Sequence, residues 1–308
     1  IIAGVSTSDY DEDVIRKHED TLQRRVELFT RYLEHVQFNA EPVLLTYPDN
    51  PSISNWITKI KSEEPHTSFH GADGGIHSLW AVLGAEAQNE LKTLFASIPA
   101  IYIADGHHRS ASSALYTHAM RRAIPGYSGK EAFNNFMGYL IPDSELQIYE
   151  FNMMVKDLHG HSSKSFKDAL SEVFNIEESY YPKIEKEKNK IGMYLEQKWY
   201  VLRPKHDQVA SGDPVESLDP QILFTKILDP ILGIKDLRKD QRIAYLYGKN
   251  SLVKIEEQIN SGNFAVGFGL APIRMSEIKA VADAGKVMPP KSTYIEPKLL
   301  SGLTIYEY

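Results

Sequence analysis

Apolar residues recur along the chain in two alternating patterns, short continuous runs typical of strands and spacings of three and four typical of helices. In the first third, continuous runs predict strands at residues 1–7 and 42–47. Helical spacing predicts one long amphipathic helix over residues 14–36 and a second helix over 85–95. A buried strand at 101–103 runs straight into a helical pattern.

The same alternation continues to the end of the chain. Two strands at 133–141 and 146–155, separated by the turn sequence PDSE, predict a hairpin. Strands alternating with helices predict an α/β or α+β fold with a mixed sheet. The polar stretch KDLHGHSSK favours a division into two domains, residues 1–158 and 159–308.

Composition and charge narrow the classes of function. Of 308 residues, 42% are hydrophobic and 24% charged, which is typical of a globular protein with a substantial core. A net charge of −7 disfavours a nucleic-acid partner but leaves a local basic pocket for phosphate open. The absence of cysteine excludes disulfides and thiol chemistry and fits a cytoplasmic location. No apolar run is long enough to span a membrane, and no signal peptide is evident.

The chain opens on Ile1, without a methionine and already inside a strand-like run. We therefore expect that a preceding segment was removed or lies outside this sequence.

The sequence IYIADGHHRSASSALY places polar residues at the switch from strand to helix. Asp105 and Gly106 make the turn, and His107, His108 and Arg109 open the helix. A helix N-terminus attracts anions, and an arginine there is unfavourable for the helix dipole unless an anion compensates it. Asp105 could cap the helix, hold a metal or polarise a hydroxyl. The alternative is an ordinary capped helix with solvated histidines.

The sequence RKHED places two candidate catalytic side chains beside the apolar stripe of the helix predicted at 14–36. These are His18 and Glu19. A carboxylate at the rim of a buried face can have a raised pKa and act as a general base. The alternative is a solvated charge on the rim of an amphipathic helix.

The sequence MPPKSTYIEPK offers a cation and two hydroxyls for a phosphate, at Lys291, Ser292 and Thr293. It lacks the glycines of a Walker A loop. A rigid arm packing on the core is the equally weighted alternative. The sequence HGADGGIHSLW, with His70, Asp73 and His77, is a weaker candidate for an active-site lid or a metal site.

The motifs YIADGHHR, HED and MPPKSTYIEPKLLSG together resemble the prokaryotic domain-of-unknown-function family 1015, over essentially the whole chain. The order of HE, a helix, a PV strand and DGHHR is similar to the ParB/sulfiredoxin-like superfamily, especially its free-serine kinases. The resemblance implies a ParB/sulfiredoxin-like N-terminal part followed by a second α+β part.

The resemblance also implies roles for residues. Glu19 would be the base, with His18 beside it, and Asp105 would lie next to the substrate or a metal. The phosphates of the nucleotide would be held by Gly106, His107, His108 and Arg109. Together with the phosphate-binding side chains that the sequence itself suggests, Lys291, Ser292 and Thr293, this predicts ADP or ATP with Mg²⁺ as the cofactor. The function implied is a cytoplasmic phosphotransferase for a small hydroxyl metabolite, with serine as a candidate and no nucleic-acid or membrane partner.

Three alternatives remain at this point. The chain could be a non-catalytic nucleotide-binding regulator that engages a protein partner. It could be a metal-dependent hydrolase of a phosphorylated small molecule, with His18, Asp105, His107 and His108 as ligands; the sequence assigns no metal. A DNA-binding clamp is disfavoured by the net charge.

Overall fold

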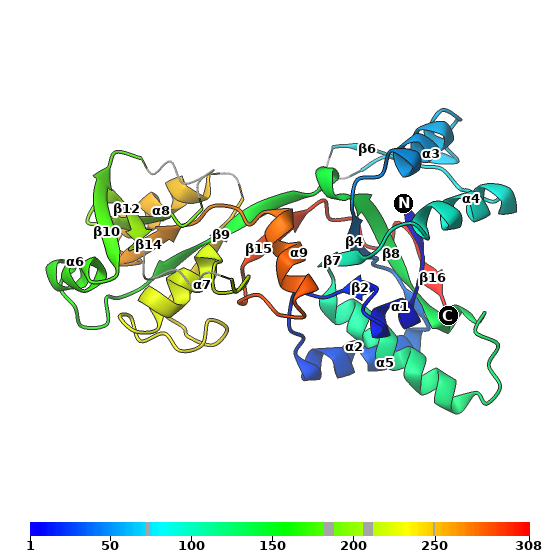
Figure 1. Cartoon of the computed structure of the whole chain (residues 1–308), viewed down its shortest axis with the longest axis horizontal. Coiled ribbons are helices and arrows are strands. Elements are labelled where there is room, and N and C mark those ends of the chain that lie inside the picture. The colour runs from blue at the N-terminus through cyan, green and yellow to red at the C-terminus, as the bar shows by residue number, and fades with distance from the viewer. Residues whose placement is uncertain (72–73, 182–187, 206–211, 249) are drawn as a thin grey trace.

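The protein is an elongated molecule of two lobes, each built around its own β-sheet (Figure 1). The structure is a computed structural model that describes residues 1–71, 74–181, 188–205, 212–248 and 250–308.

The first lobe contains a mixed five-stranded sheet in the order β1-β8-β4-β7-β2. Its strands are β1 (Ile2–Ser6), β2 (Ile15–Arg16), β4 (Val43–Tyr47), β7 (Ile101–Asp105) and β8 (Asn135–Pro142). Its helices are α1 (Thr7–Asp11), α2 (Gln23–Val36), α3 (Pro51–Lys61), α4 (Ala85–Phe95) and α5 (His107–Ala123). The central strand β4 is buried at every position, which explains its continuous apolar sequence. Helices α2 and α5 pack against each other.

This lobe also contains two pairs of short strands outside the main sheet. β3 (Phe38–Asn39) pairs with β16 (Tyr306–Glu307), and β5 (Thr67–His70) pairs with β6 (Ile76–Leu79).

The second lobe contains a seven-stranded antiparallel sheet. Its strands are β9 (Gln147–Val155), β10 (Phe174–Ser179), β11 (Ile191–Leu195), β12 (Lys198–Pro204), β13 (Ile243–Tyr247), β14 (Val266–Gly269) and β15 (Thr293–Glu296). Its helices are α6 (Ser163–Ser171), α7 (Asp219–Leu223) with a π-helical turn at Phe224–Leu228, α8 (Ser251–Asn260) and α9 (Met275–Asp283). Phe268, fully buried on β14, lies in the main core of this lobe.

The C-terminal segment ties the two lobes together. Leu44 and Ile141 of the first sheet share a buried cluster with Ile278 and Val281 of α9. Strand β16 returns to β3 in the first lobe, so both ends of the chain lie there (Figure 1). Strand β9 belongs to the second sheet although it precedes residue 158, and the division at that residue stays a prediction.

The α+β class with a mixed sheet is confirmed, as are most predicted strands and helices to within a few residues. The single helix predicted over 14–36 is wrong. Ile15 and Arg16 instead pair in parallel with Ile101 and Tyr102, and the helix begins only at Gln23. A buried strand of two residues contributes an apolar residue that also fits the spacing of one helical turn. The hydrophobic pattern therefore could not distinguish the short strand from the start of a helix.

The predicted hairpin is also wrong. Strands β8 and β9 do follow one another across PDSE, but β8 pairs with β1 and β4 in the first sheet. Strand β9 pairs with β13, β14 and β15 in the second sheet. The turn therefore connects the two lobes instead of closing a hairpin.

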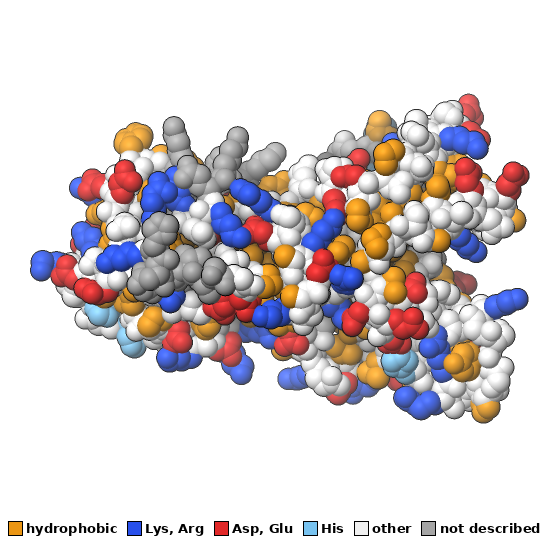
Figure 2. Space-filling view, viewed as in Figure 1, with side chains coloured by type: hydrophobic (Ala, Val, Ile, Leu, Met, Phe, Trp, Pro, Cys, Tyr) orange, Lys and Arg blue, Asp and Glu red, His pale blue; other side chains and the backbone are white. Residues whose placement is uncertain are grey.

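Two surface properties bear on the partners considered above. Acidic and basic side chains are intermixed over the face shown in Figure 2. Within the described residues, no helix combines the length and apolar character required to cross a bilayer.

Candidate functional site

The strand-to-helix switch lies where the sequence predicts it, with β7 ending at Asp105 and α5 beginning at His107. Gly106 between them has φ +104°, a backbone conformation that favours glycine. A Cβ atom at this position would lie 3.1 Å from Nε of Arg109. The backbone of the turn therefore favours glycine, and a side chain at this position would also press on the guanidinium of Arg109.

The side chain of Arg109 contacts oxygen atoms of the protein itself. One guanidinium nitrogen donates to Oδ2 of Asp105 at 2.6 Å, and the other donates to the carbonyl of Pro42. Oε2 of Glu41 lies 3.7 Å away, and Nζ of Lys298 lies 3.7 Å from Oδ1 of Asp105. The anions that compensate Arg109 at the helix N-terminus are thus carboxylates of this chain.

A small pocket of about 70 Å³ lies beside this ion pair. Its lining includes Glu41, Asp105 and Arg109 together with Tyr139 and Lys298. This volume is far below the several hundred Å³ typical of a pocket for a drug-sized ligand, so a whole nucleotide does not fit there.

His18 and Glu19 lie in the loop between β2 and α2, and not on a helix as predicted. The loop brings them against α5: the rings of His18 and His107 meet edge to face with centroids 4.5 Å apart. Both rings are almost completely buried. The backbone N–H of His18 donates to Nε2 of His107 at 3.4 Å.

His107 is neutral and lies next to the carboxylate of Glu19. Burial, and next to it the neighbouring His18, hold the pKa of His107 well below its usual value, so the ring is neutral. Because Nε2 accepts the hydrogen bond from His18, the proton of the neutral ring is on Nδ1. Nδ1 lies 3.7 Å from Oε2 of Glu19, which is longer than a hydrogen bond.

The carboxylate of Glu19 is half exposed and has a raised pKa. Burial is the larger cause, and the negative charge of Asp105 adds to it. Three cations act in the opposite direction on this pKa: Arg238, Lys291 and Arg25. A carboxylate with a raised pKa, partly open to solvent, has the properties of a general base.

The three cations come from separate parts of the chain. Arg25 is in the first turn of α2, Arg238 is in the segment before β13, and Lys291 precedes β15. Arg25 and Arg238 also lower the pKa of His108, after burial, and Nε2 of His108 accepts from the backbone N–H of Leu22 at 3.0 Å. Over the ranges that the structure describes, none of these three side chains forms an ion pair with a carboxylate. Their charges remain available to an anion.

The segment MPPKST joins this site through its backbone. The N–H of Met288 donates to the carbonyl of His18 at 2.8 Å. Of its three candidates, only Lys291 acts on Glu19. The hydroxyl of Ser292 is buried and donates to the carbonyl of Pro289, while Thr293 is paired with Glu150 on β9.

The metal-site candidates do not form a group that could bind a metal ion. In the portion of the chain that the structure covers, no group of three or more His, Asp or Glu could hold a metal ion, and the set of His18, Asp105, His107 and His108 is no exception. The ring of His77 stacks on Phe69, and Asp73 lies outside the described residues.

Sequence reasoning missed Arg25 and Arg238. Arg25 follows the last residue of HED by five positions, a proximity in sequence that could have suggested it. Arg238 is about two hundred residues away and stands among other surface charges, and no local signal distinguishes it.

The buried His18 makes stability depend on pH. Burial lowers its pKa from 6.5 to about 4. Between these values the unfolded state binds the proton and the folded state does not, so the free energy of unfolding falls as the pH falls. We expect His18 to account for about 3 kcal/mol of this loss, the equivalent of its pKa shift. Urea unfolding measured across the pH range should therefore show that the free energy of unfolding falls less steeply with falling pH in His18→Asn than in the wild type.

The matched control for this measurement is His66→Asn, at an exposed position away from the site. Its free energy of unfolding should fall with falling pH as steeply as that of the wild type. If the free energy of unfolding fell equally steeply with pH in all three proteins, His18 would not be the cause of the pH dependence.

Comparison with known proteins adds the following. A family model described as "Protein of unknown function (DUF1015)" matches residues 1–221. None of the curated proteins matches. Similar solved structures include a free serine kinase variant with ADP (12% identity, TM-score 0.46, covering 97% of this chain and 91% of that one). SbnI with C-terminal truncation from Staphylococcus aureus is also similar, at 12% identity and a TM-score of 0.49, covering 97% of this chain and 85% of that one. A conserved hypothetical protein from Pyrococcus furiosus is similar at 14% identity and a TM-score of 0.44, covering 97% of this chain and 93% of that one.

Proposed function

The chain belongs to the DUF1015 family, and from the site around Glu19 we propose that it is a nucleotide-dependent phosphotransferase acting on a small hydroxyl metabolite. One observation carries the proposal. The charges of Arg25, Arg238 and Lys291, which come from three segments, act on the pKa of one half-exposed carboxylate, and within the described structure these cations form no ion pair. Phosphoryl transfer needs positive charge around the phosphates and a group that orients the attacking hydroxyl.

Each element of the site has a part in this reaction. The three cations and the N-terminal amides of α5, from His107 to Arg109, bind the phosphate oxygens. Arg109 acts as a positioning residue, since its side chain bonds Asp105 and the carbonyl of Pro42 and so holds the turn. Ser292 and Thr293 would stiffen the segment that carries Lys291.

Glu19 acts as the general base. It takes the proton of the acceptor hydroxyl as the new oxygen–phosphorus bond forms and the bond to the nucleotide's leaving oxygen breaks. The ring of His107 lies beside the carboxylate, and His18 packs behind that ring. The cations stabilise the charge on the transferred phosphoryl group and on the leaving oxygen.

Magnesium fits this arrangement only as part of the nucleotide complex. Mg²⁺ is usually bound by one or two carboxylates together with substrate phosphates. Asp105, whose charge acts on Glu19, is the carboxylate that would contact it, and the ion would supply further neutralisation of phosphate charge.

The proposed site draws on both predicted domains. Glu19, Arg25 and the turn belong to residues 1–158, whereas Arg238 and Lys291 belong to 159–308. We propose that this division is real and that the second part completes the phosphate site of the first. The motif resemblance to free-serine kinases makes serine the first acceptor to test. A location in the cytoplasm is part of the same proposal.

Nucleotide binding is tested by thermal unfolding with ADP and ATP, with and without Mg²⁺. A ligand at 100 times its Kd adds about 2.7 kcal/mol to the free energy of unfolding, a readily visible shift in Tm. We expect Arg25→Ala to lose most of this shift because it removes one of three phosphate cations. Arg24→Ala, the neighbouring exposed arginine, should keep it.

Equal shifts in Arg25→Ala and Arg24→Ala would contradict the phosphate role of Arg25. A shift with no transfer to any hydroxyl compound would instead favour a nucleotide-binding regulator.

A further inference from the structure

Aromatic side chains gather on one face of the second sheet, along β9. Strands β13 and β15 pair with consecutive parts of β9, over residues 151–155 and 147–150. Side chains that lie opposite each other in paired strands share a face, as do those two positions apart in one strand. Five rings therefore lie on one face and form what we call the aromatic cluster: Tyr149, Phe151, Tyr245, Tyr247 and Tyr294.

Tyr247 is the exposed member of a stacked pair. Its ring and that of Tyr294 lie 4.2 Å apart between centroids, with 19° between their planes. The centroid of Phe151 lies 5.3 Å from that of Tyr247 and 6.4 Å from that of Tyr294. Because 6.4 Å is far less than the other two distances combined, Phe151 lies beside the stacked pair and not on the far face of Tyr247. With Tyr247 48% exposed, the ring face that points away from Tyr294 is accessible.

A lysine connects the aromatic cluster to the turn at Gly106. Nζ of Lys298 lies 3.7 Å from Oδ1 of Asp105 and 4.9 Å from the ring centroid of Tyr294. One side chain therefore reaches both the turn and the stacked pair, which places the aromatic cluster beside the proposed phosphate site.

Two of the proposed phosphate cations come from segments that contact the aromatic cluster. Nζ of Lys291 lies 5.5 Å from the ring centroid of Phe151. The hydroxyl of Tyr245 donates at 2.6 Å to the carbonyl of Leu237, the residue before Arg238. The positive charges assigned to the phosphates and the aromatic rings are thus neighbours in space.

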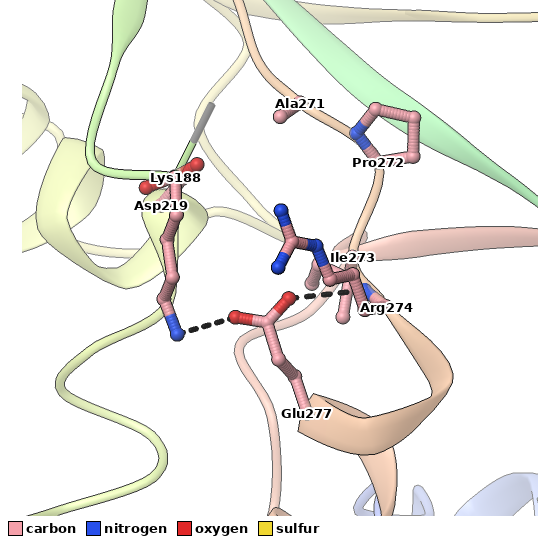
Figure 3. Close-up of a pocket in the computed structure, with 7 residues that line it drawn as sticks. All are labelled: Lys188, Asp219, Ala271, Pro272, Ile273, Arg274 and Glu277. Atoms are coloured by element: carbon pink, nitrogen blue, oxygen red, sulfur yellow. Dashed lines mark hydrogen bonds and ion pairs between the residues drawn. The ribbon is translucent and has the colours of Figure 1, made fainter. Parts of the chain in front are cut away.

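A larger cavity, of about 420 Å³, offers no such surface in its described lining. Figure 3 shows that part of the wall, where Nζ of Lys188 lies 2.5 Å from Oε1 of Glu277 and none of the side chains drawn is aromatic. Among the described residues, the aromatic cluster is therefore the stronger candidate for a flat ligand.

We propose that the accessible ring face of Tyr247 binds the base of the nucleotide whose phosphates lie among Arg25, Arg238 and Lys291. This inference rests on the proposed function and adds the part of the site that holds the base. Nucleobases of every kind stack on aromatic side chains, because every base has a π-face. The base extends the stack of Tyr294 and Tyr247 by a third ring, in the offset arrangement that aromatic pairs prefer.

Calorimetric titration of the whole chain with ADP and with pyrophosphate, both with Mg²⁺, separates the base from the phosphates. Tyr247→Ala should weaken ADP binding by about 5–150-fold, the usual effect of removing an aromatic ring that stacks on a base. The affinity for pyrophosphate, which has no base, should stay that of the wild type. Tyr247→Phe retains the ring and should bind ADP like the wild type.

Tyr127→Ala is the matched control. Tyr127 is 41% exposed and lies against Arg121, near the end of α5 that is opposite to the turn. Both ligands should bind this variant with wild-type affinity. If Tyr247→Ala failed to fold, Tyr247→Leu, which keeps an apolar side chain without a ring, would replace it with the same expectation for ADP.

The outcomes separate this inference from the proposed function. Unchanged ADP affinity in Tyr247→Ala, or equal weakening of ADP and pyrophosphate, would overturn the base site and leave the phosphate site standing. Binding of pyrophosphate without binding of ADP by the wild type would do the same. Binding of neither ligand by the wild type would overturn the proposed function and the base site with it.

Discussion

Replacing Glu19 by Gln should lower phosphoryl transfer by about 10²–10⁴-fold, the typical contribution of a general base. The amide keeps the shape of the side chain and its place beside Nδ1 of His107, but it cannot accept the proton of the acceptor hydroxyl. Nucleotide affinity should stay close to that of the wild type, because the phosphates contact the cations and the helix amides. Transfer from ATP and from ADP to serine and other small hydroxyl compounds is the measurement.

The pH profile provides a second readout for Glu19. Because a base must be ionised, transfer by the wild type should fall as the pH drops through the raised pKa of Glu19. This limb should be absent from the residual activity of Glu19→Gln. Glu27→Gln, an exposed acid on α2, is the matched control and should leave rate and profile unchanged. Full activity in Glu19→Gln would exclude the base role, and loss of nucleotide binding would reassign Glu19 to the binding site.

Replacing Phe268 by Ala should lower the free energy of unfolding by about 3–5 kcal/mol, the usual cost of removing a buried aromatic ring. Phe268 is fully buried on β14, opposite Met193 of β11 and Met153 of β9. The strands on both sides cannot move into the space without breaking the sheet, so a cavity remains. Urea unfolding of the whole chain measures the loss.

The control for this prediction is Phe69→Ala on the β5–β6 hairpin. Phe69 is 38% exposed and stacks on the ring of His77. Its removal should change the free energy of unfolding by no more than about 0.5 kcal/mol, as is usual for surface positions. A similar loss in the two variants would mean that the core around Phe268 is less tightly packed than the structure indicates.

The local parts of the fold were predictable, and the long-range parts were not. The turn at Gly106 could be placed because a buried strand, a glycine and a helical pattern follow one another within a few residues. Pairing of β8 with β1, and of β9 with β13, depends on segments far apart in sequence, and PDSE gives no local sign that it separates two sheets.

In the candidate site, too, only the features local in sequence were predictable. Glu19 was found because a carboxylate stands beside an apolar pattern, although the residues around it form a strand and a loop. The contact of His18 with His107 exists only once the first lobe has folded, and the effect of Arg238 on Glu19 exists only once the two lobes are assembled. The motif resemblance identifies the turn, but it does not show that the guanidinium of Arg109 donates a hydrogen bond to Asp105.

The return of the chain to its first lobe has a consequence for synthesis on the ribosome. Strand β16 pairs with β3, and the hydroxyl of Tyr308 bonds the amide of Asn39, 269 residues earlier. At 5–20 residues per second, translation of that interval takes on the order of tens of seconds. Throughout this time strand β3 is not yet paired with β16, and Tyr116 of α5 is not yet covered by the ring of Tyr308. The first lobe emerges early but reaches its final packing only after residues 306–308 have left the exit tunnel.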